Sequence, residues 1–103
     1  MYAQRVTIYP RPENVREVRD LLVERVKARQ AAGSRAALSE LVAGSDAPQF
    51  TVGSRFDDLA AFEASRKRDQ ADADFQKFVA KLTSLLRKPS AFDLMEVLVS
   101  MPS

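Results

Sequence analysis

Along two stretches of the chain, polar and apolar side chains alternate with a period of two, which is typical of β-strands. These stretches are residues 2–10, where prolines end the pattern, and residues 49–56. Residues 35–42 predict a further strand, and the glycine- and proline-containing segment 44–48 predicts the turn of a hairpin. The apolar segment 91–99 predicts the final strand.

Apolar side chains three and four positions apart predict an amphipathic helix of about five turns in residues 13–33. Pro12 suits the first turn of a helix, and Gly33 suits a C-terminal cap. A second helix is expected to begin at Asp57 or Asp58, because either side chain can act as its N-terminal cap. The apolar stripe of the first helix consists of Val15, Val18, Leu21, Leu22 and Val26.

The second helical region has an interrupted apolar pattern. Leu59 and Phe62 are large apolar anchors at its start, whereas residues 63–74 contain no large apolar side chain. Asp72 or Asp74 can cap a new helical segment at this point. We therefore expect two helical pieces with an exposed joint at residues 63–74. The second piece carries a stripe that we expect in the core, namely Phe75, Phe78, Val79, Leu82, Leu85 and Leu86.

The predicted order of elements is strand, helix, strand, strand, helix, strand. Two split βαβ halves of this kind give a four-stranded antiparallel sheet with both helices on one face. The predicted fold class is therefore α+β, with a ferredoxin-like βαββαβ arrangement. A length of 103 residues fits one domain, and we expect it to span residues 1–103.

The final predicted strand is apolar on both faces. Phe92, Leu94 and Leu98 share one face of residues 91–99, and Met95, Val97 and Val99 share the other. A sheet with one solvated face normally alternates between apolar and polar residues. We therefore expect the second face to pack against another copy of the chain, as a homodimer with twofold symmetry. The alternative is that these side chains lie at a sheet edge under a loop.

Composition excludes several classes of site. The chain has no cysteine and no histidine, which excludes disulfides, thiolate chemistry, Ser-His-Asp catalysis and ordinary zinc sites. We expect no metal and no cofactor. The absence of cysteine suits a cytoplasmic protein. The net charge of +2 is small, and the basic triplet 66–68 is spread around a helix, so we expect no nucleic-acid partner. No apolar run approaches the roughly 20 residues of a membrane span, so we expect no membrane partner.

Two segments resemble the dimeric α+β barrel superfamily, and in particular its small monooxygenase-like and NIPSNAP-like members. The stronger is "SRFDDLAAFEASRKRDQADADFQKFVAKLTSLL", residues 54–86, and the other is "YAQRVTIYPRPENVREVRDLL", residues 2–22. The resemblance implies a dimeric α+β barrel, in which the sheets of two identical chains face each other. It also implies a small cleft between sheet and helices in each chain.

The chain departs from the superfamily members that form quinones without a cofactor. Those proteins use asparagine, tryptophan and histidine, whereas this chain has no tryptophan, no histidine and one asparagine, Asn14. We therefore favour a small-molecule-binding or structural module with an apolar cleft. The alternative is a cofactor-independent monooxygenase or isomerase that acts on a small aromatic or polyketide-like substrate. Whether the protein is an enzyme stays open.

Polar residues within the predicted strands are the candidate contacts for a small apolar or aromatic ligand. Gln4 and Ser54 share a face with apolar neighbours and could be the few polar groups of an apolar pocket. An arginine in a strand could hold a carboxylate, although we favour exposed strand ends or cross-strand ion pairs as the explanation of such charges. The candidate ligand-binding residues are Gln4, Arg5, Tyr9, Ser54, Arg55 and Glu96.

Overall fold

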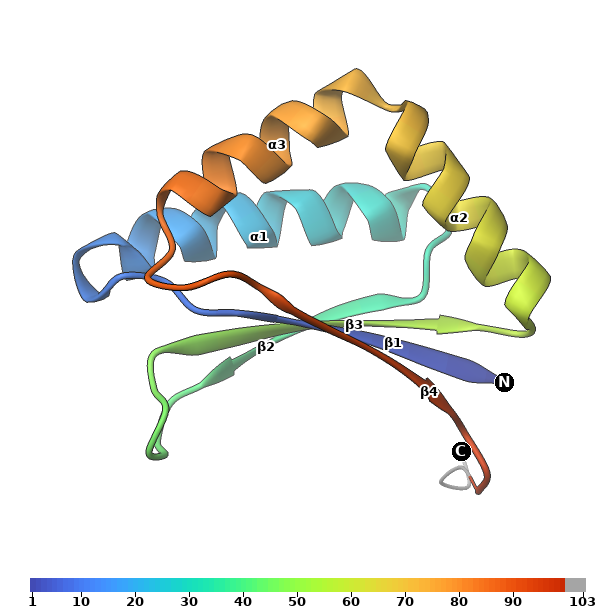
Figure 1. Ribbon diagram of the computed structural model, residues 1–103, viewed down its shortest axis with the longest axis horizontal. Helices are drawn as coiled ribbons and strands as arrows, with labels where there is room; N and C mark the ends of the chain where they lie inside the picture. The colour runs from blue at the N-terminus through green and yellow to red at the C-terminus, as the bar shows by residue number, and fades with distance from the viewer. Residues whose placement is uncertain (100–103) are drawn as a thin grey trace.

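Four strands form one antiparallel sheet in the computed structural model, which describes residues 1–99 (Figure 1). The strand order is β2–β3–β1–β4, so that β1 and β3 lie at the centre. This arrangement confirms the predicted ferredoxin-like α+β fold. The strands are β1 (Tyr2–Ile8), β2 (Ala36–Leu41), β3 (Gln49–Phe56) and β4 (Ala91–Glu96).

Three helices lie on one face of the sheet, as Figure 1 shows. A 3-10 turn, η1 (Pro12–Asn14), leads into α1 (Val15–Ala31), and Gly33 follows α1 with a φ of 95°. That left-handed conformation favours glycine, which confirms its predicted role at the end of the helix. The other two helices are α2 (Leu59–Ala71) and α3 (Ala73–Ser84), which meet at an angle and form an arch above the sheet.

The joint between α2 and α3 is a single non-helical residue, Asp72. Its carboxylate accepts hydrogen bonds from the backbone N–H groups of Asp74 at 2.9 Å and Phe75 at 3.2 Å. Asp58 caps α2 in the same way, through the N–H of Ala61 at 2.8 Å. The two predicted helical pieces and their caps are confirmed. The joint is shorter than the predicted range 63–74, because most of that polar segment continues α2 as an exposed helix.

Replacing Asp72 with alanine should lower the free energy of unfolding by about 1 kcal/mol, because two backbone N–H groups lose their acceptor. Chemical denaturation of the variant and the parent would measure this loss. Gln70→Ala is a suitable control, since Gln70 is exposed and lies in the same polar segment. An equal effect of both substitutions would contradict the capping role.

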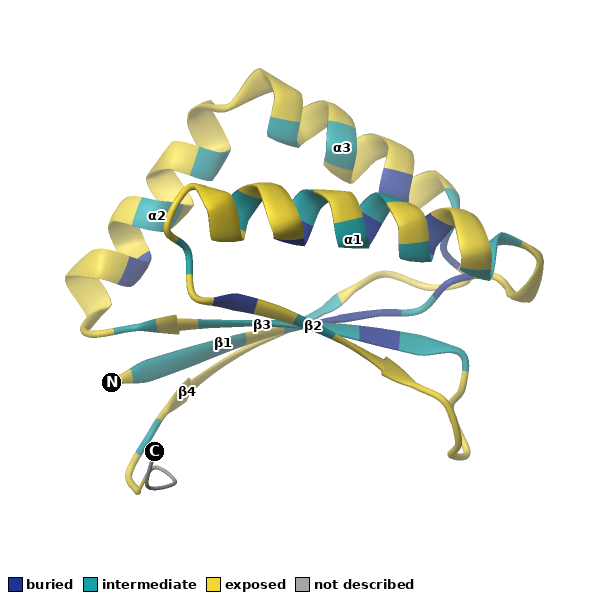
Figure 2. Cartoon of the chain, turned by 180° about the vertical axis from the view of Figure 1, so that it is seen from behind, coloured by how far each residue is buried: buried dark blue, intermediate teal, exposed yellow. Residues whose placement is uncertain are grey.

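The hydrophobic core lies between the sheet and the inner sides of α1 and α3. Figure 2 shows the buried positions of α1 on the side that faces the sheet, and most of α2 exposed. Phe62 is the buried anchor of α2, and its ring contacts those of Phe56 and Phe92. The buried cluster consists of Ile8, Val18, Leu22, Phe50, Leu82 and Leu86.

Three expectations about buried side chains need correction. Leu59 is 45% exposed and does not anchor α2. Phe75, at the start of α3, is half-buried and lies outside the core cluster, and Val79 is exposed. The arch explains this result, because it holds the N-terminal half of α3 away from the sheet. The C-terminal half approaches the sheet, and Leu82 is buried there as predicted.

The strand predicted for residues 91–99 ends at Glu96, so its predicted extent is wrong. The register pairs Leu94 with Gln4 and Met95 with Ala3, which puts Leu94 on the helix-facing side of the sheet and Met95 on the open side. Val97 and Val99 lie beyond the strand, so the open face is less apolar than predicted. Leu98 and Val99 are instead 84% and 92% exposed.

Candidate functional site

An apolar cavity of about 230 Å³ lies between the sheet and the helices α1 and α3. Its floor belongs to the central strands β1 and β3. Its sides belong to α1 and to α3, whose N-terminal half the arch holds away from the sheet. The volume is below that of typical sites for drug-sized ligands, so it suits a molecule of about one ring. The floor and the wall on α3 include Gln4, Val6, Val52, Ser54, Phe75 and Phe78.

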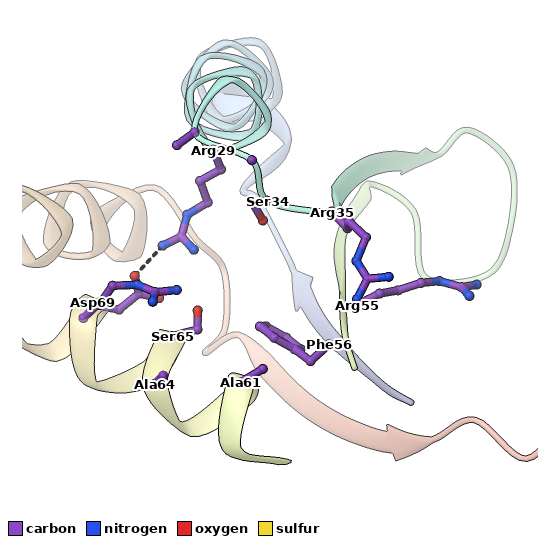
Figure 3. A pocket seen from close by; sticks show the side chains of 12 residues that line it. Arg29, Ser34, Arg35, Arg55, Phe56, Ala61, Ala64, Ser65 and Asp69 are labelled. Atoms are coloured by element: carbon purple, nitrogen blue, oxygen red, sulfur yellow. Dashed lines mark hydrogen bonds and ion pairs between the residues drawn. The ribbon is translucent and has the colours of Figure 1, made fainter. Parts of the chain in front are cut away.

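A second, polar cavity of about 500 Å³ lies beside the C-terminal end of α1, between the end of β3 and α2. Figure 3 shows Arg29 reaching from α1 toward Asp69 on α2, with the ring of Phe56 below them. Arg35 and Arg55 also line this space, on the side of the strands, and Arg35 pairs with Asp57 at 2.8 Å. The lining of the polar cavity thus contains the ion pair of Arg29 and Asp69 together with further arginines, namely Arg35, Arg55 and Arg68.

The ion pair between Arg29 and Asp69 belongs to the lining of both cavities. The Nη2 atom of Arg29 donates to a carboxylate oxygen of Asp69 at 2.8 Å, and both side chains are partly buried. The guanidinium of Arg29 also lies 5.2 Å from the ring centroid of Phe75. This pair is thus the boundary between the apolar and the polar cavity, and it links α1 to α2.

Arg25 lies on α1 and lines the apolar cavity. Its guanidinium lies 5.0 Å from the ring centroid of Phe75 and 5.5 Å from that of Phe78. The Nε atom of Arg25 is buried and has no hydrogen-bond partner among residues 1–99. The sequence did not indicate this residue, because it belongs to a polar face of an amphipathic helix and no local pattern shows which arginine meets another helix.

Gln4 and Ser54 are the two candidate residues that the structure brings together. They occupy paired positions on β1 and β3, and both lie on the floor of the apolar cavity. The alternation of their strands placed them on the same face as apolar neighbours, and the sheet register adds that they are adjacent. Both side chains can donate and accept hydrogen bonds, so together they can orient a polar group of a ligand.

The structure separates the other candidate residues from this floor. Arg5 lies on the open face of the sheet and pairs with Asp93 at 3.4 Å. Arg55 lies at the end of β3, where its Nη1 atom is 3.7 Å from the sulfur of Met1. Glu96 ends β4, and Tyr9 follows β1, with the Nζ atom of Lys88 4.1 Å from its ring centroid. None of Arg5, Tyr9 and Glu96 lines either cavity.

An ion pair with shifted pKa values lies outside both cavities. Arg19 on α1 donates two hydrogen bonds to Glu40 on β2, at 3.0 and 2.9 Å. The hydrogen bond from Arg19 lowers the pKa of Glu40 below its ordinary value, and the same bond raises the pKa of Arg19. This pair contributes to the contact between helix and sheet, and it does not line the apolar cavity.

Two further features of the described chain bear on possible ligands and surroundings. Within residues 1–99, no three acidic side chains gather closely enough to hold a metal ion. None of the helices in that range combines the length and apolar character that crossing a bilayer requires.

No protein-family model matches the sequence, and no curated protein matches it either. Solved structures do resemble the chain. A NIPSNAP domain protein from Burkholderia xenovorans superposes with a TM-score of 0.80 at 16% identity over 100% of both chains. A putative antibiotic biosynthesis monooxygenase from Deinococcus radiodurans gives a TM-score of 0.75 at 20% identity, over 100% of this chain and 98% of the other.

A third similar structure is a protein of unknown function from Nitrosomonas europaea, with a TM-score of 0.69 at 21% identity over 99% of this chain and 94% of the other. At such low identities, the likeness shows a shared fold, which hosts unrelated functions. The comparison confirms the resemblance to monooxygenase-like and NIPSNAP-like proteins and the ferredoxin-like α+β fold of the single chain, and the implied dimer stays a prediction. The chain therefore has the ferredoxin-like α+β fold that these proteins share.

Proposed function

We propose that the protein is a small-molecule-binding module whose site is the apolar cavity between the sheet and the helices α1 and α3. The observation that supports this function is a largely apolar lining with two adjacent polar groups, Gln4 and Ser54, on its floor. Ligand sites commonly combine apolar walls with a few polar groups that fix orientation. Binding a small apolar or aromatic molecule requires no further chemistry from the chain.

A cofactor-independent monooxygenase or isomerase with a small aromatic substrate is the second candidate. The apolar cavity could hold such a substrate, and similar structures include proteins named as antibiotic biosynthesis monooxygenases. The lining favours binding without chemistry, because its one carboxylate, Asp69, is engaged by Arg29. Oxygen consumption with a single-ring hydroquinone, which matches the size of the cavity, separates the binding module from a monooxygenase. A rate far above that of buffer would establish the enzyme, and a rate equal to buffer would favour the binding module.

Toluene, a neutral single-ring probe, should bind saturably to the protein, and Ser54→Leu should weaken that binding at least about tenfold, because the added side-chain volume fills the apolar cavity. Titration followed by NMR chemical shifts measures both affinities. Ser39→Leu is the matched control, since Ser39 is an exposed strand serine on the other face of the sheet. Absence of saturable binding by the parent protein would overturn the proposed function.

We further propose that the chain forms one domain that assembles as a homodimer through β4 and the residues after it. This region carries five exposed large apolar side chains of the described chain, although it spans only nine described residues, 91–99. As an edge strand, β4 also presents unpaired backbone groups on its outer side. A second copy can cover this surface with the same surface of its own. The five side chains are Phe92, Leu94, Met95, Leu98 and Val99.

A further inference from the structure

We propose that the apolar cavity takes a small aromatic carboxylate, and that Arg25 holds its carboxylate group. This inference rests on the proposed function, because it names the chemical class of ligand for the same cavity. The cavity is apolar in most of its lining, but it contains a cation whose charge no described side chain balances. A ligand that combines an apolar ring with one negative charge satisfies both properties.

The hydrogen-bonding state of Arg25 is the first observation. Its Nε atom is buried, and no described residue provides a hydrogen-bond partner for it. Within residues 1–99, no carboxylate lies within ion-pairing distance of its guanidinium. A buried donor normally has an acceptor, and an ionised group that loses water without gaining a partner is destabilised. Arg25 is therefore a cation at the wall of an apolar cavity with capacity for an anion.

The position of Arg25 is fixed before any ligand arrives. Its guanidinium packs against the rings of Phe75 and Phe78, with centroid distances of 5.0 and 5.5 Å. These contacts are attractive for a cation, and they limit the rotamers that a long side chain can adopt. An anion that binds here meets a guanidinium that is already in place, which reduces the ordering cost of binding.

The charges of the lining point to a single negative charge on the ligand. Three charged side chains line the apolar cavity, namely Arg25, Arg29 and Asp69. Arg29 and Asp69 neutralise each other in an ion pair of 2.8 Å, whereas Arg25 has no such partner among the described residues. One positive charge remains, so a monoanion balances the cavity and a dianion does not.

Size and shape then select the class of monoanion. A volume of about 230 Å³ accommodates about one ring, and valines and phenylalanines of the lining provide apolar contact for it. A planar carboxylate can accept two parallel hydrogen bonds from the terminal Nη groups of an arginine. Gln4 and Ser54 lie on the floor and can bind a further polar substituent. Benzoate is the simplest probe of this class, and benzamide is its neutral counterpart of nearly equal shape.

The test compares benzoate and benzamide on the same protein by NMR titration. The parent protein should bind benzoate at least about tenfold more tightly than benzamide, because a charge-assisted pair replaces a neutral contact. Arg25→Met, which keeps an apolar stem beside Phe75, should reduce this preference to less than about twofold. Arg16→Met is the matched control, since Arg16 is an exposed arginine of the same helix, and the preference should persist there.

A measurement on the parent protein alone can overturn the inference, so the test does not depend on the folding of a variant. If toluene and benzamide bind in the cavity but benzoate binds no more tightly than benzamide, the apolar site stands and the role of Arg25 is overturned. If none of the three probes binds, the proposed function fails and the inference fails with it. A benzoate preference that persists in a folded Arg25→Met variant would also overturn the assignment, because another group would then hold the anion.

Discussion

Replacing Phe50 with alanine should lower the free energy of unfolding by about 3–5 kcal/mol, the range for large aromatic side chains removed from a core. Phe50 is 1% exposed and belongs to the core cluster together with Ile8, Val18 and Leu22. Its removal deletes apolar contact and leaves a cavity between the sheet and α1. Because small domains have a total stability of about 5–15 kcal/mol, the loss is a large share of the whole.

Chemical denaturation at a fixed protein concentration measures this effect. Phe56→Ala is a matched control, because Phe56 lies on the same strand and the same face of the sheet but is only half-buried. We expect a clearly smaller loss for Phe56→Ala. Equal losses for the two variants would mean that the core is not centred where the structure places it.

Replacing Leu98 with glutamate should weaken the proposed homodimer about a hundredfold or more. Leu98 is 84% exposed, so the substitution removes little from the fold of a single chain. Within an interface, however, the new carboxylate would lose water without gaining a partner, at a cost of about 3 kcal/mol, which corresponds to roughly that factor. Light scattering at micromolar concentration would show a dimer for the parent and a monomer for the variant.

Val42→Glu is the matched control for the dimer, because Val42 is 86% exposed and follows β2 at the opposite edge of the sheet. The Val42→Glu variant should have the mass of a dimer in solution, as the parent does. A parent protein that is monomeric at micromolar concentration would contradict the proposed assembly. Equal weakening by both substitutions would place the interface elsewhere.

Features that depend on short-range sequence were predictable. Alternation in residues 49–56 gave the strand β3 and the face of its side chains, because successive residues of a strand point to opposite sides. The caps Asp58 and Asp72 were predictable because a carboxylate before a helix satisfies backbone N–H groups a few residues away. Gly33 was predictable because the end of a helix often requires a left-handed conformation.

Features that depend on distances between elements were not predictable. An apolar stripe shows which side of α3 faces inward, but it does not show how far the helix stands from the sheet. Phe75 therefore looked like a core residue, although it lines a cavity under the arch. Arg25 looked like an ordinary surface arginine, because only the packing of α1 against α3 brings it over two aromatic rings.

The residue at which β4 ends could not be predicted from the sequence pattern either. Residues 97–99 are apolar and suit a strand, but the residue pairs of β1 and β4 end at Tyr2 and Glu96, and beyond them the N–H of Val97 donates to the carbonyl of Met1 at 2.9 Å. The point where two neighbouring strands stop pairing is a property of the sheet, which the pattern within one strand does not show. Leu98 and Val99, which follow the end of β4, are exposed in the single chain and belong to the proposed interface.

The location of a bound neutral probe tests the central claim, that the apolar cavity is a binding site, most directly. With toluene present, intermolecular nuclear Overhauser effects should connect its protons to the methyl groups of Val6, Val52 and Leu82, which line the cavity. The methyl group of Ala3, on the open face of the sheet, should show none. Contacts confined to Ala3 or to Leu98, with none to the three cavity residues, would contradict the account.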